Sequence, residues 1–414
     1  MDRILATHTG SLIRPPELLK FLAARDAGES YDEGQYAEVL RNAVKDIVDK
    51  QVDAGIDVVD DGEMGKTSWI TYLYERVSGL EARLVTLEGA SMLPPSRDRQ
   101  QFPGAYAELD ALDEAATRSS NIAPDGSQRD DGEGEAGGDE VSQVVQWVCT
   151  GPITYDRSAL DRDIANLRAA LEDHPETEAF LPVVAPASAY WLTNEHYGSE
   201  EEFIYALADA LHEEYKAIVD AGFLLQVDDA VLMHEWDTML SRGQSDDDYR
   251  RWAQLRVDAL NHALRGLPED RVRYHVCWGS WHGPHAYDPP LKDTVGLILQ
   301  VTAGYYAMEQ ANARHEHEWR VWEDVALPEG KKLIPGVVTH HTNVVEHPEL
   351  VAQRLIRLAN VVGRENVLAG TDCGFAQGAF IHRVHPEIQW AKLAALAEGA
   401  RIASRELWGA AAAV

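Results

Sequence analysis

The chain of 414 residues is long enough for one large domain with additions, or for two ordinary domains. It carries 69 acidic and 37 basic residues, a formal net charge of -32, and such a surface repels nucleic acids and anionic membranes. No apolar run approaches the roughly 18 residues of a membrane span, and the N-terminus lacks the apolar core of a signal peptide. We therefore expect a cytoplasmic protein that binds neither nucleic acid nor membrane.

Two interpretations of the acidity stay open. Most of the basic residues are arginines, and a strongly acidic, lysine-poor surface is typical of halophilic proteins, because salt screens the repulsion between the acidic groups. An acidic enzyme from an ordinary cell is the equal alternative. The charge therefore bears on solubility and habitat, and leaves the fold open.

The chain contains three cysteines, Cys149, Cys277 and Cys373. An odd number this small argues against a framework of disulfides and for a reducing compartment. In such a compartment, widely spaced cysteines with histidine nearby indicate metal binding or catalysis more often than crosslinking.

Apolar runs and helical patterns alternate along the chain. A short extended segment ends at Gly10 and Ser11, and a pattern of helix, glycine, apolar strand and polar turn then recurs. The pattern predicts strands at residues 56–64, 144–154, 180–186, 223–230, 274–277, 305–309, 333–338 and 367–373. It predicts helices at residues 36–54, 161–171, 201–221, 250–264, 291–299, 348–362 and from 388 to the region of 401.

Eight strands alternating with helices predict an α/β fold, a closed parallel (β/α)8 TIM barrel. An open, doubly wound sheet is the alternative, but the chain lacks the phosphate-binding glycine-rich turn after the first strand. We expect a single barrel domain over residues 1–414, preceded within it by an N-terminal segment at 1–35. Polar residues at the carboxyl ends of the strands would then share one rim, the catalytic face of such barrels.

The stretch from 84 to 140 does not follow the alternation. It is rich in Asp, Glu, Gly, Ser and Pro, and its acidic run at 130–140 cannot bury enough apolar surface to offset the cost of ordering it. We predict an acidic insertion on the rim of the barrel, flexible at its centre.

A candidate metal site begins at the strand that contains His275 and Cys277. Residues two apart on a strand point the same way, so this strand presents an imidazole and a thiol on one face, half of a tetrahedral zinc site. Glu309 and Cys373 each stand at the end of another predicted strand, on the same rim. We expect the four donors to converge on one Zn²⁺ at about 2.0–2.3 Å.

The chemistry of this donor set favours activation of a thiol over activation of water. A substrate thiol can displace the weakly held carboxylate and bind as a thiolate, its pKa lowered by the metal. A purely structural zinc site would more typically use Cys pairs two to four residues apart, which the chain lacks.

Further polar residues at strand ends are candidates for binding and catalysis. Glu63 and Asp228 end two predicted strands and could bind an ammonium or hydroxyl group, although such residues also cap helices or form ion pairs, which is an equal interpretation for Asp229. His315 and His317 follow Glu309 closely, and we assign them acid–base or supporting roles; two residues apart on a helix, they would face apart.

His340, with His341 beside it, follows the seventh predicted strand and is a candidate for proton delivery.

Several motifs together resemble the catalytic domain of cobalamin-independent methionine synthases. The matching pieces stand in the same order over nearly the whole chain: Thr9-Gly-Ser11 with Arg14, Asp61-Gly-Glu63, Thr150-Gly-Pro152, Gln226-Val-Asp-Asp229, His275-x-Cys277, Glu309, Pro335-Gly-Val337 and Asp372-Cys-Gly374. The resemblance implies a (β/α)8 barrel and attack of a zinc-bound thiolate on an electrophilic carbon. Methyl transfer to a homocysteine-type thiol, and so methionine biosynthesis, is the leading expectation.

The resemblance also implies roles for single residues. It places zinc on His275, Cys277, Glu309 and Cys373, and it places the thiol substrate near Ser11, Glu63 and Asp228. The partners it implies are a small-molecule thiol and an alkyl donor, with a methyl-carrier protein as one possible source of the methyl group.

Three departures from the family pattern keep alternatives open. The chain has no room for the second, N-terminal half that helps the full-length synthases to hold polyglutamylated folate, and its net charge of -32 suits a polyanionic folate tail poorly. Asp-Asp-Ala also replaces the family's Asp-Glu-Pro after Val227, which leaves the role of Asp229 open. Single-domain relatives include epoxyalkane:coenzyme M transferases, and the histidines after Glu309, with His340, would suit protonation of an epoxide oxygen. Arg14 would then be the cation for a sulfonate. A zinc hydrolase and a non-catalytic, zinc-stabilised barrel are further alternatives.

Overall fold

The structure is a computed structural model that describes residues 2–87, 96–110 and 142–409, and these residues build an α/β fold around a seven-stranded sheet that forms a half-barrel. All neighbouring strands of this sheet are parallel. In spatial order the strands are β1 (Val58–Val59), β4 (Glu178–Val184), β6 (Leu224–Asp228), β7 (Val272–Val276), β8 (Tyr305–Glu309), β9 (Lys332–Val338) and β10 (Gly370–Thr371).

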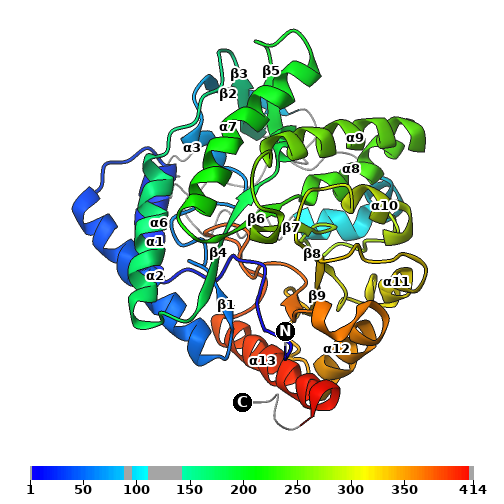
Figure 1. The fold of residues 1–414 in the computed structure, drawn as a ribbon. Coiled ribbons are helices and arrows are strands. Elements are labelled where there is room, and N and C mark those ends of the chain that lie inside the picture. Colours follow the sequence, from blue (N-terminus) through cyan, green and yellow to red (C-terminus); the bar gives the residue numbers. More distant parts are fainter. Residues whose placement is uncertain (1, 88–95, 111–141, 410–414) are drawn as a thin grey trace.

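The helices lie around the outside of these strands, and the long helices α12 and α13 pack side by side (Figure 1). The α-helices are α1 (Pro16–Asp26), α2 (Glu33–Asp53), α3 (Tyr72–Arg76), α4 (Arg97–Gln101), α6 (Ser158–Ala170), α7 (Glu200–Asp220), α8 (Ala230–Ser241), α9 (Asp246–Ala263), α10 (Leu291–Ile298), α11 (Val321–Asp324), α12 (Pro348–Val362) and α13 (Pro386–Trp408). The 3-10 helices are η1 (Leu171–Asp173), η2 (Pro186–Trp191), η3 (Glu269–Arg271), η4 (Glu316–Arg320) and η5 (Arg364–Asn366).

The seven predicted helices are confirmed, and local side chains explain where several begin. Asp32 accepts a hydrogen bond from the Gln35 N–H at the start of α2, and Ser245 opens α9 with a reciprocal capping box. Among the residues described, no helix is long and apolar enough to cross a membrane.

The prediction for residues 144–154 was right about a strand and wrong about its sheet. These residues form β3 (Ser142–Cys149), which pairs with β2 (Leu80–Leu87) and β5 (Leu192–Asn194) in a separate three-stranded sheet, while β1 pairs directly with β4. An apolar run indicates a strand but does not say which strand it pairs with, and here an antiparallel partner 55 or more residues earlier in the chain takes it.

The extended N-terminal segment forms bridges next to both edge strands of the seven-stranded sheet, a position that the sequence had not indicated. Ala6 forms a parallel bridge with Ala369, and Thr7 forms one with Val58. The Thr7 N–H donates to the Ala369 carbonyl at 2.8 Å, and the Val58 N–H donates to the Ala6 carbonyl at 3.2 Å. The segment therefore lies between the first and the last strand of the seven-stranded sheet.

The predicted insertion at 84–140 begins within β2. Residues 96–110, which hold α4 and a helical stretch at 103–110, pack against the rest of the chain; the remaining parts of the insertion, at 88–95 and 111–140, lie outside the described residues.

Close packing of β9 against β10 depends on a glycine. A Cβ atom on Gly336 would lie 2.4 Å from the Cα atom and 2.6 Å from the backbone nitrogen of Asp372, and backbone atoms cannot move aside as a flexible side chain can. Gly336 thus lets the strand end that carries Asp372 and Cys373 lie directly against β9.

We expect Gly336→Ala to lower the free energy of unfolding by roughly 1–3 kcal/mol, because the added methyl group forces the two backbones apart. Denaturant unfolding of the purified chain measures this. Gly296→Ala on α10 is the control, because its Cβ meets nothing within 4 Å, and it should be neutral or stabilising by up to about 1 kcal/mol. Equal stability of both variants would contradict the account of this contact.

Candidate functional site

The site is built from the carboxyl ends of neighbouring parallel strands. The register of the sheet pairs Asp228 at the end of β6 with His275 on β7, and His275 Nδ1 donates a hydrogen bond of 2.9 Å to Asp228 Oδ1. Burial alone would lower the pKa of His275, but this hydrogen bond and the charge of Asp228 outweigh burial and raise it. His275 Nε2 is buried and has no hydrogen-bond partner among the described residues.

Two cysteine thiols lie next to this imidazole. Cys277 follows β7, Cys373 follows β10, and their side chains are hydrogen-bonded to each other. This bond is the main reason why the pKa of Cys373 is lowered and that of Cys277 is raised, so Cys373 is the thiol of the pair that ionises more readily. Ser280 Oγ donates to Cys373 Sγ at 3.0 Å and stabilises that charge.

Glu309 ends β8 and is buried beside the thiols. Its Oε1 atom accepts the Trp278 N–H at 2.9 Å, and its Oε2 atom accepts Asn312 Nδ2 at 2.5 Å. Burial first, and then the neighbouring charges of Asp372 and Cys373, raise its pKa. The carboxylate is therefore held by the backbone after β7 at one oxygen and by the turn after β8 at the other.

Asp372 fixes the backbone between these residues. Its Oδ1 atom accepts the N–H groups of Gln310 and Ala311, each at 2.9 Å, so the residue before Cys373 holds the turn that follows Glu309. Sequence reasoning used Asp372 only as part of a motif and missed this role.

The donor types suit a zinc ion, because an imidazole nitrogen without a hydrogen-bond partner, two hydrogen-bonded thiols and a carboxylate lie buried at the ends of neighbouring strands. Their positions do not meet the predicted geometry. Within residues 2–87, 96–110 and 142–409, no three or more His, Cys, Asp or Glu side chains are grouped closely enough to hold a metal ion. The distances of about 2.0–2.3 Å expected for zinc ligands therefore stay a prediction.

Glu63 lies in a tight turn after β1. It adopts a left-handed backbone with φ of 56°, which is strained for a residue with a side chain, and its N–H donates to Asp61 Oδ1 at 2.9 Å. Arg14 holds the same turn, because its Nη2 atom donates to the Glu63 carbonyl at 2.8 Å while Nη1 donates to the Ala376 carbonyl at 3.3 Å. Arg14 is thus placed to position Glu63.

The side chain of Glu63 is itself poised for a cation. Burial raises its pKa to about 7 against the lowering effect of Lys66, whose Nζ atom lies 3.9 Å from Glu63 Oε2. Oε2 has no hydrogen-bond partner among the described residues. The charge of Asp228 is a further cause of the raised pKa, so the two carboxylates face a common region.

Ser11 lies against the backbone that follows Cys373. Its carbonyl accepts the Phe375 N–H at 2.8 Å, and a Cβ atom on Gly374 would lie 2.1 Å from Ser11 Oγ. The hydroxyl of Ser11 is therefore packed directly against the residue that follows Cys373.

His340 follows β9 and is buried, and neither ring nitrogen has a hydrogen-bond partner among the described residues. Its pKa is lowered mainly by burial and further by the neighbouring His341, Arg383 and His275. The His340 ring packs edge-on against His341, with 4.7 Å between centroids. His340 is thus a neutral imidazole close to His275.

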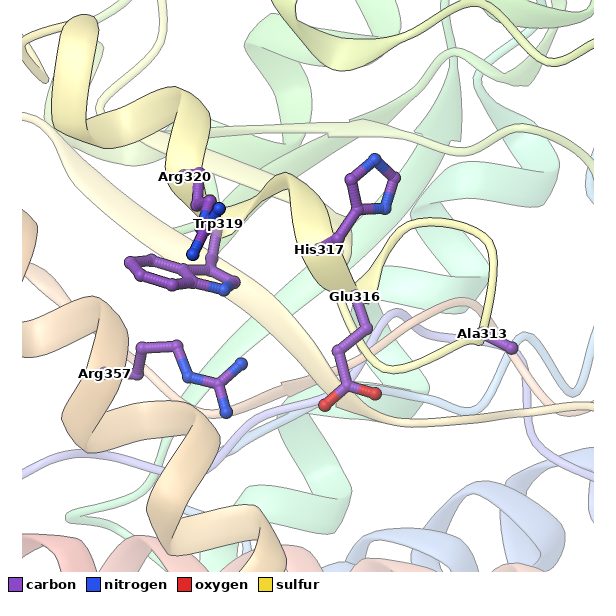
Figure 2. A pocket seen from close by; sticks show the side chains of 6 residues that line it. All are labelled: Ala313, Glu316, His317, Trp319, Arg320 and Arg357. Carbon is purple, nitrogen blue, oxygen red and sulfur yellow. The ribbon is translucent and has the colours of Figure 1, made fainter.

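The two histidines after Glu309 lie in different surroundings. His315 is buried, stacks on Trp278 with 4.2 Å between centroids, and bonds to Asp288 at 3.0 Å and to Glu318 at 2.9 Å. His317 is exposed and lies in the wall of a surface pocket, shown in Figure 2. The structure therefore links His315 to the surroundings of the site and places His317 apart from it.

A loop after β7 covers this edge of the sheet, and the flank of the insertion holds it. Asp98 of α4 is buried and accepts the backbone N–H groups of His285 and Ala286, each at 3.0 Å, together with the Tyr106 hydroxyl at 2.8 Å. His285 has a left-handed backbone with φ of 54°. One carboxylate thus fixes a strained turn, and the low apolar content of the insertion hid this from sequence reasoning.

Asp229 has a structural role. It accepts the Leu232 N–H at 3.3 Å as the N-cap of α8, and it accepts the Tyr274 hydroxyl at 2.8 Å. The capping interpretation of Asp229 is confirmed.

A protein-family model described as "Cobalamin-independent synthase, Catalytic domain" matches residues 188–395, half of the chain. The chain belongs to the cobalamin-independent methionine synthase family. The matched segment contains all four predicted zinc ligands and Asp228, so the resemblance inferred from the motifs is confirmed at the level of the family.

Full-length similarity supports the same assignment. Methionine synthase of Thermococcus kodakarensis is 22% identical over 402 residues, which cover 96% of this chain and 93% of that protein. Methionine synthase of Pyrococcus furiosus is 23% identical over 401 residues, covering 96% and 92%.

A B12-independent methionine synthase from a Shewanella species, solved with selenomethionine, has a similar fold. It superposes with a TM-score of 0.66 at 19% identity, covering 98% of this chain and 99% of the other. A putative B12-independent methionine synthase from Listeria monocytogenes gives a TM-score of 0.63 at 18% identity.

His315 gives this member of the family a pH-dependent contribution to stability. Burial opposes its charge, but the hydrogen bonds to Asp288 and Glu318 outweigh burial and raise its pKa to about 9 from 6.5. A group with a raised folded-state pKa stabilises the fold fully below the unfolded value, and the contribution is lost as the pH rises through the folded value. We expect His315→Gln to lower the free energy of unfolding by an amount on the order of 3 kcal/mol at pH 6.

The deficit of His315→Gln should shrink as the pH rises from about 6.5 past 9. Denaturant unfolding at a series of pH values measures it, with the exposed His196→Gln as the control. A deficit that stays constant across this range would show that His315 acts by packing alone.

The Asp98 contacts predict a local effect on the loop after β7. Asp98→Ala leaves two backbone N–H groups without their acceptor, so the free energy of unfolding should fall by about 1–3 kcal/mol. The amides of His285 and Ala286 should exchange with solvent much faster than in the parent chain, as hydrogen-exchange mass spectrometry can measure. Asp110→Ala is the control, because Asp110 forms a partly exposed ion pair with Arg99. This substitution should lower the free energy of unfolding by about 1 kcal/mol or less. If these amides exchange in Asp98→Ala as slowly as in the parent chain, Asp98 does not hold the loop.

Proposed function

We propose that this chain is a zinc-dependent methyltransferase that methylates the thiol of a homocysteine-type substrate. The observation that carries the proposal is the buried group at the ends of β7 and β10. There the imidazole of His275, whose Nε2 atom has no hydrogen-bond partner among the described residues, lies near Cys373, and the thiols of Cys373 and Cys277 are hydrogen-bonded to each other. Family membership supports methyl transfer as the reaction, since the named relatives are methionine synthases.

In this proposal His275, Cys277, Glu309 and Cys373 would hold the zinc ion. When bound, zinc lowers the pKa of a substrate thiol and presents the sulfur as a thiolate nucleophile. Asp228 holds His275 by Nδ1 and so leaves Nε2 as the coordinating atom.

The carboxylates at the other side of the site would bind the amino acid part of the thiol substrate. An ammonium group pairs well with a buried carboxylate oxygen that accepts no hydrogen bond; Glu63 Oε2 accepts none among the described residues, Lys66 stays 3.9 Å away, and the charge of Asp228 is close to it. The bound ammonium would in turn favour the ionised form of Glu63. Ser11 would contribute its hydroxyl to the same substrate.

Arg14 argues against the coenzyme M alternative. Two of its guanidinium nitrogens already donate to the carbonyls of Glu63 and Ala376, so it is occupied in shaping the turn of Glu63. We therefore assign it to positioning and favour an ammonium-bearing thiol over a sulfonate-bearing one.

His340 is the group we propose for proton transfer. A thiol that becomes a thiolate releases one proton, and a neutral imidazole with unpartnered nitrogens can accept it. As the new S–C bond forms, the bond between the methyl group and its donor breaks, the donor keeps the electron pair, and His340 can return the proton to it.

We also infer that the segment around Ala6 and Thr7 serves as an eighth strand that closes a (β/α)8 barrel, and that residues 1–414 form one domain. The parallel bridges to Ala369 and Val58 support this. The net charge of -32 favours a methyl donor without a polyanionic tail. Cytoplasmic location and a salty habitat stay predictions.

The zinc proposal predicts different fates for two buried cysteines. Cys373→Ser should lose bound zinc and reduce methyl transfer to homocysteine on the order of a hundredfold or more, because serine is a poor zinc ligand at neutral pH. Metal analysis and an assay of methionine formation measure the two effects.

Cys149→Ser is the matched control, since Cys149 is also buried but bonds only to the Gly151 carbonyl in the part of the chain described. It should keep zinc and activity. A Cys373→Ser variant that retains both zinc and methyl transfer would contradict the proposal.

A further inference from the structure

One face of β6 and β7 carries two pairs of side chains, one pair next to the other along the strands. The register of the two strands pairs Gln226 with Arg273 and, two residues further on, Asp228 with His275. Residues two apart on a strand point to the same face, so Gln226 and Arg273 form a layer directly beneath the pair that belongs to the candidate site. All four residues are buried.

The lower pair holds the N-terminal segment. Arg273 Nη2 donates a hydrogen bond of 2.8 Å to the His8 carbonyl, and Gln226 Nε2 donates to the Thr9 carbonyl. Thr9 stands two residues before Ser11, whose hydroxyl we assign to the thiol substrate. The backbone that leads to Ser11 is therefore fixed by two buried side chains of the sheet.

Gln226 also holds the carboxylate above it. The same Nε2 atom donates to Asp228 Oδ1 at 2.9 Å, and this oxygen also accepts His275 Nδ1. An amide nitrogen has two hydrogens, and the Thr9 carbonyl and Asp228 use both of them. Asp228 Oδ1 thus receives two hydrogen bonds, whereas no residue in the described part of the chain donates one to Oδ2.

We propose that Gln226 is a positioning residue for the ammonium group of the thiol substrate. Because Gln226 and His275 both donate to Oδ1, the lone pairs of Asp228 Oδ2 stay available, and a charge-assisted hydrogen bond from an ammonium group can use them. Through the Thr9 carbonyl, the same amide fixes the segment of Ser11. The inference rests on the proposed methyltransferase function and adds that one amide links two parts of its substrate site.

Titration calorimetry on the zinc-loaded chain tests the proposal with two thiols, homocysteine and 4-mercaptobutyrate, which is homocysteine without its ammonium group. Gln226→Met keeps the length of the side chain but donates no hydrogen bond. Homocysteine should therefore bind about tenfold more weakly to this variant, while the affinity for 4-mercaptobutyrate should stay within about twofold. Equal weakening of both thiols, or no weakening of either, would overturn the proposal.

Gln146→Met is the matched control, because Gln146 Nε2 also donates to a side chain, Thr193 Oγ1 at 2.7 Å, but in the separate three-stranded sheet. This substitution should leave both affinities within about twofold. A similar selective loss of homocysteine in Gln146→Met would show that the effect is not specific to Gln226.

Hydrogen exchange separates this link from the proposed function. In Gln226→Met the amides of Thr9 and Gly10 should exchange with solvent about tenfold faster than in the parent chain, because the segment loses one of its contacts. A parent chain that binds no homocysteine would contradict the proposed function, whereas unchanged exchange in Gln226→Met would overturn the link through Gln226.

The parent chain provides a second measurement that does not depend on the folding of Gln226→Met. Homocysteine should slow the exchange of the Thr9 and Gly10 amides, because its ammonium group fixes Asp228 and thereby Gln226. The thiol without an ammonium group, 4-mercaptobutyrate, should not slow them. Equal slowing by both thiols, or by neither, would overturn the proposal.

Discussion

The hydrogen bond between His275 and Asp228 determines which atom the rest of the site can use. The register of β6 and β7 places the two residues side by side, and the Nδ1–H of the imidazole donates to the carboxylate. Nε2 is then left without a hydrogen-bond partner among the described residues. The fold thereby selects a tautomer as well as a position, which a metal-binding or proton-transferring histidine requires.

Burial of charge is the second constraint, and the backbone around the site is arranged to support it. Carboxylates at strand ends accept backbone N–H groups across neighbouring turns, as Asp372 does for Gln310 and Ala311. Two residues with side chains, Glu63 and His285, adopt strained left-handed backbones, and their N–H groups donate hydrogen bonds to Asp61 and Asp98, which hold them there. Strain of this kind is found where a side chain must point in one particular direction.

Much of the fold could be predicted from the sequence because local patterns determine it. Helical spacing located seven helices, and apolar runs located seven strands of the main sheet. The role of residues 142–149 could not be predicted, because strand pairing depends on partners far away in the chain. For the same reason the short segment at Ala6 and Thr7, too brief to stand out, was not identified as the neighbour of both edge strands.

The types of donor residue at the site could be predicted from the sequence, but the residues that hold the surrounding loops in place could not. Residues at strand ends share one edge of a parallel sheet, so His275, Cys277, Glu309 and Cys373 could be grouped from the sequence. The hydrogen bonds by which Asp98 holds the loop after β7 could not be predicted, because Asp98 stands in a polar stretch that resembles a flexible insertion. Closeness in the sequence did not place His317 at the site: it stands two residues from buried His315 and yet faces the solvent.

The central claim is that a zinc ion at these four residues activates a thiol. The most direct measurement is the zinc content of the purified chain together with its zinc X-ray absorption spectrum, recorded with and without homocysteine. The account predicts a bound zinc ion with two sulfur ligands that gains a further sulfur ligand when homocysteine is added. A chain without zinc, or a zinc spectrum that homocysteine leaves unchanged, would contradict it.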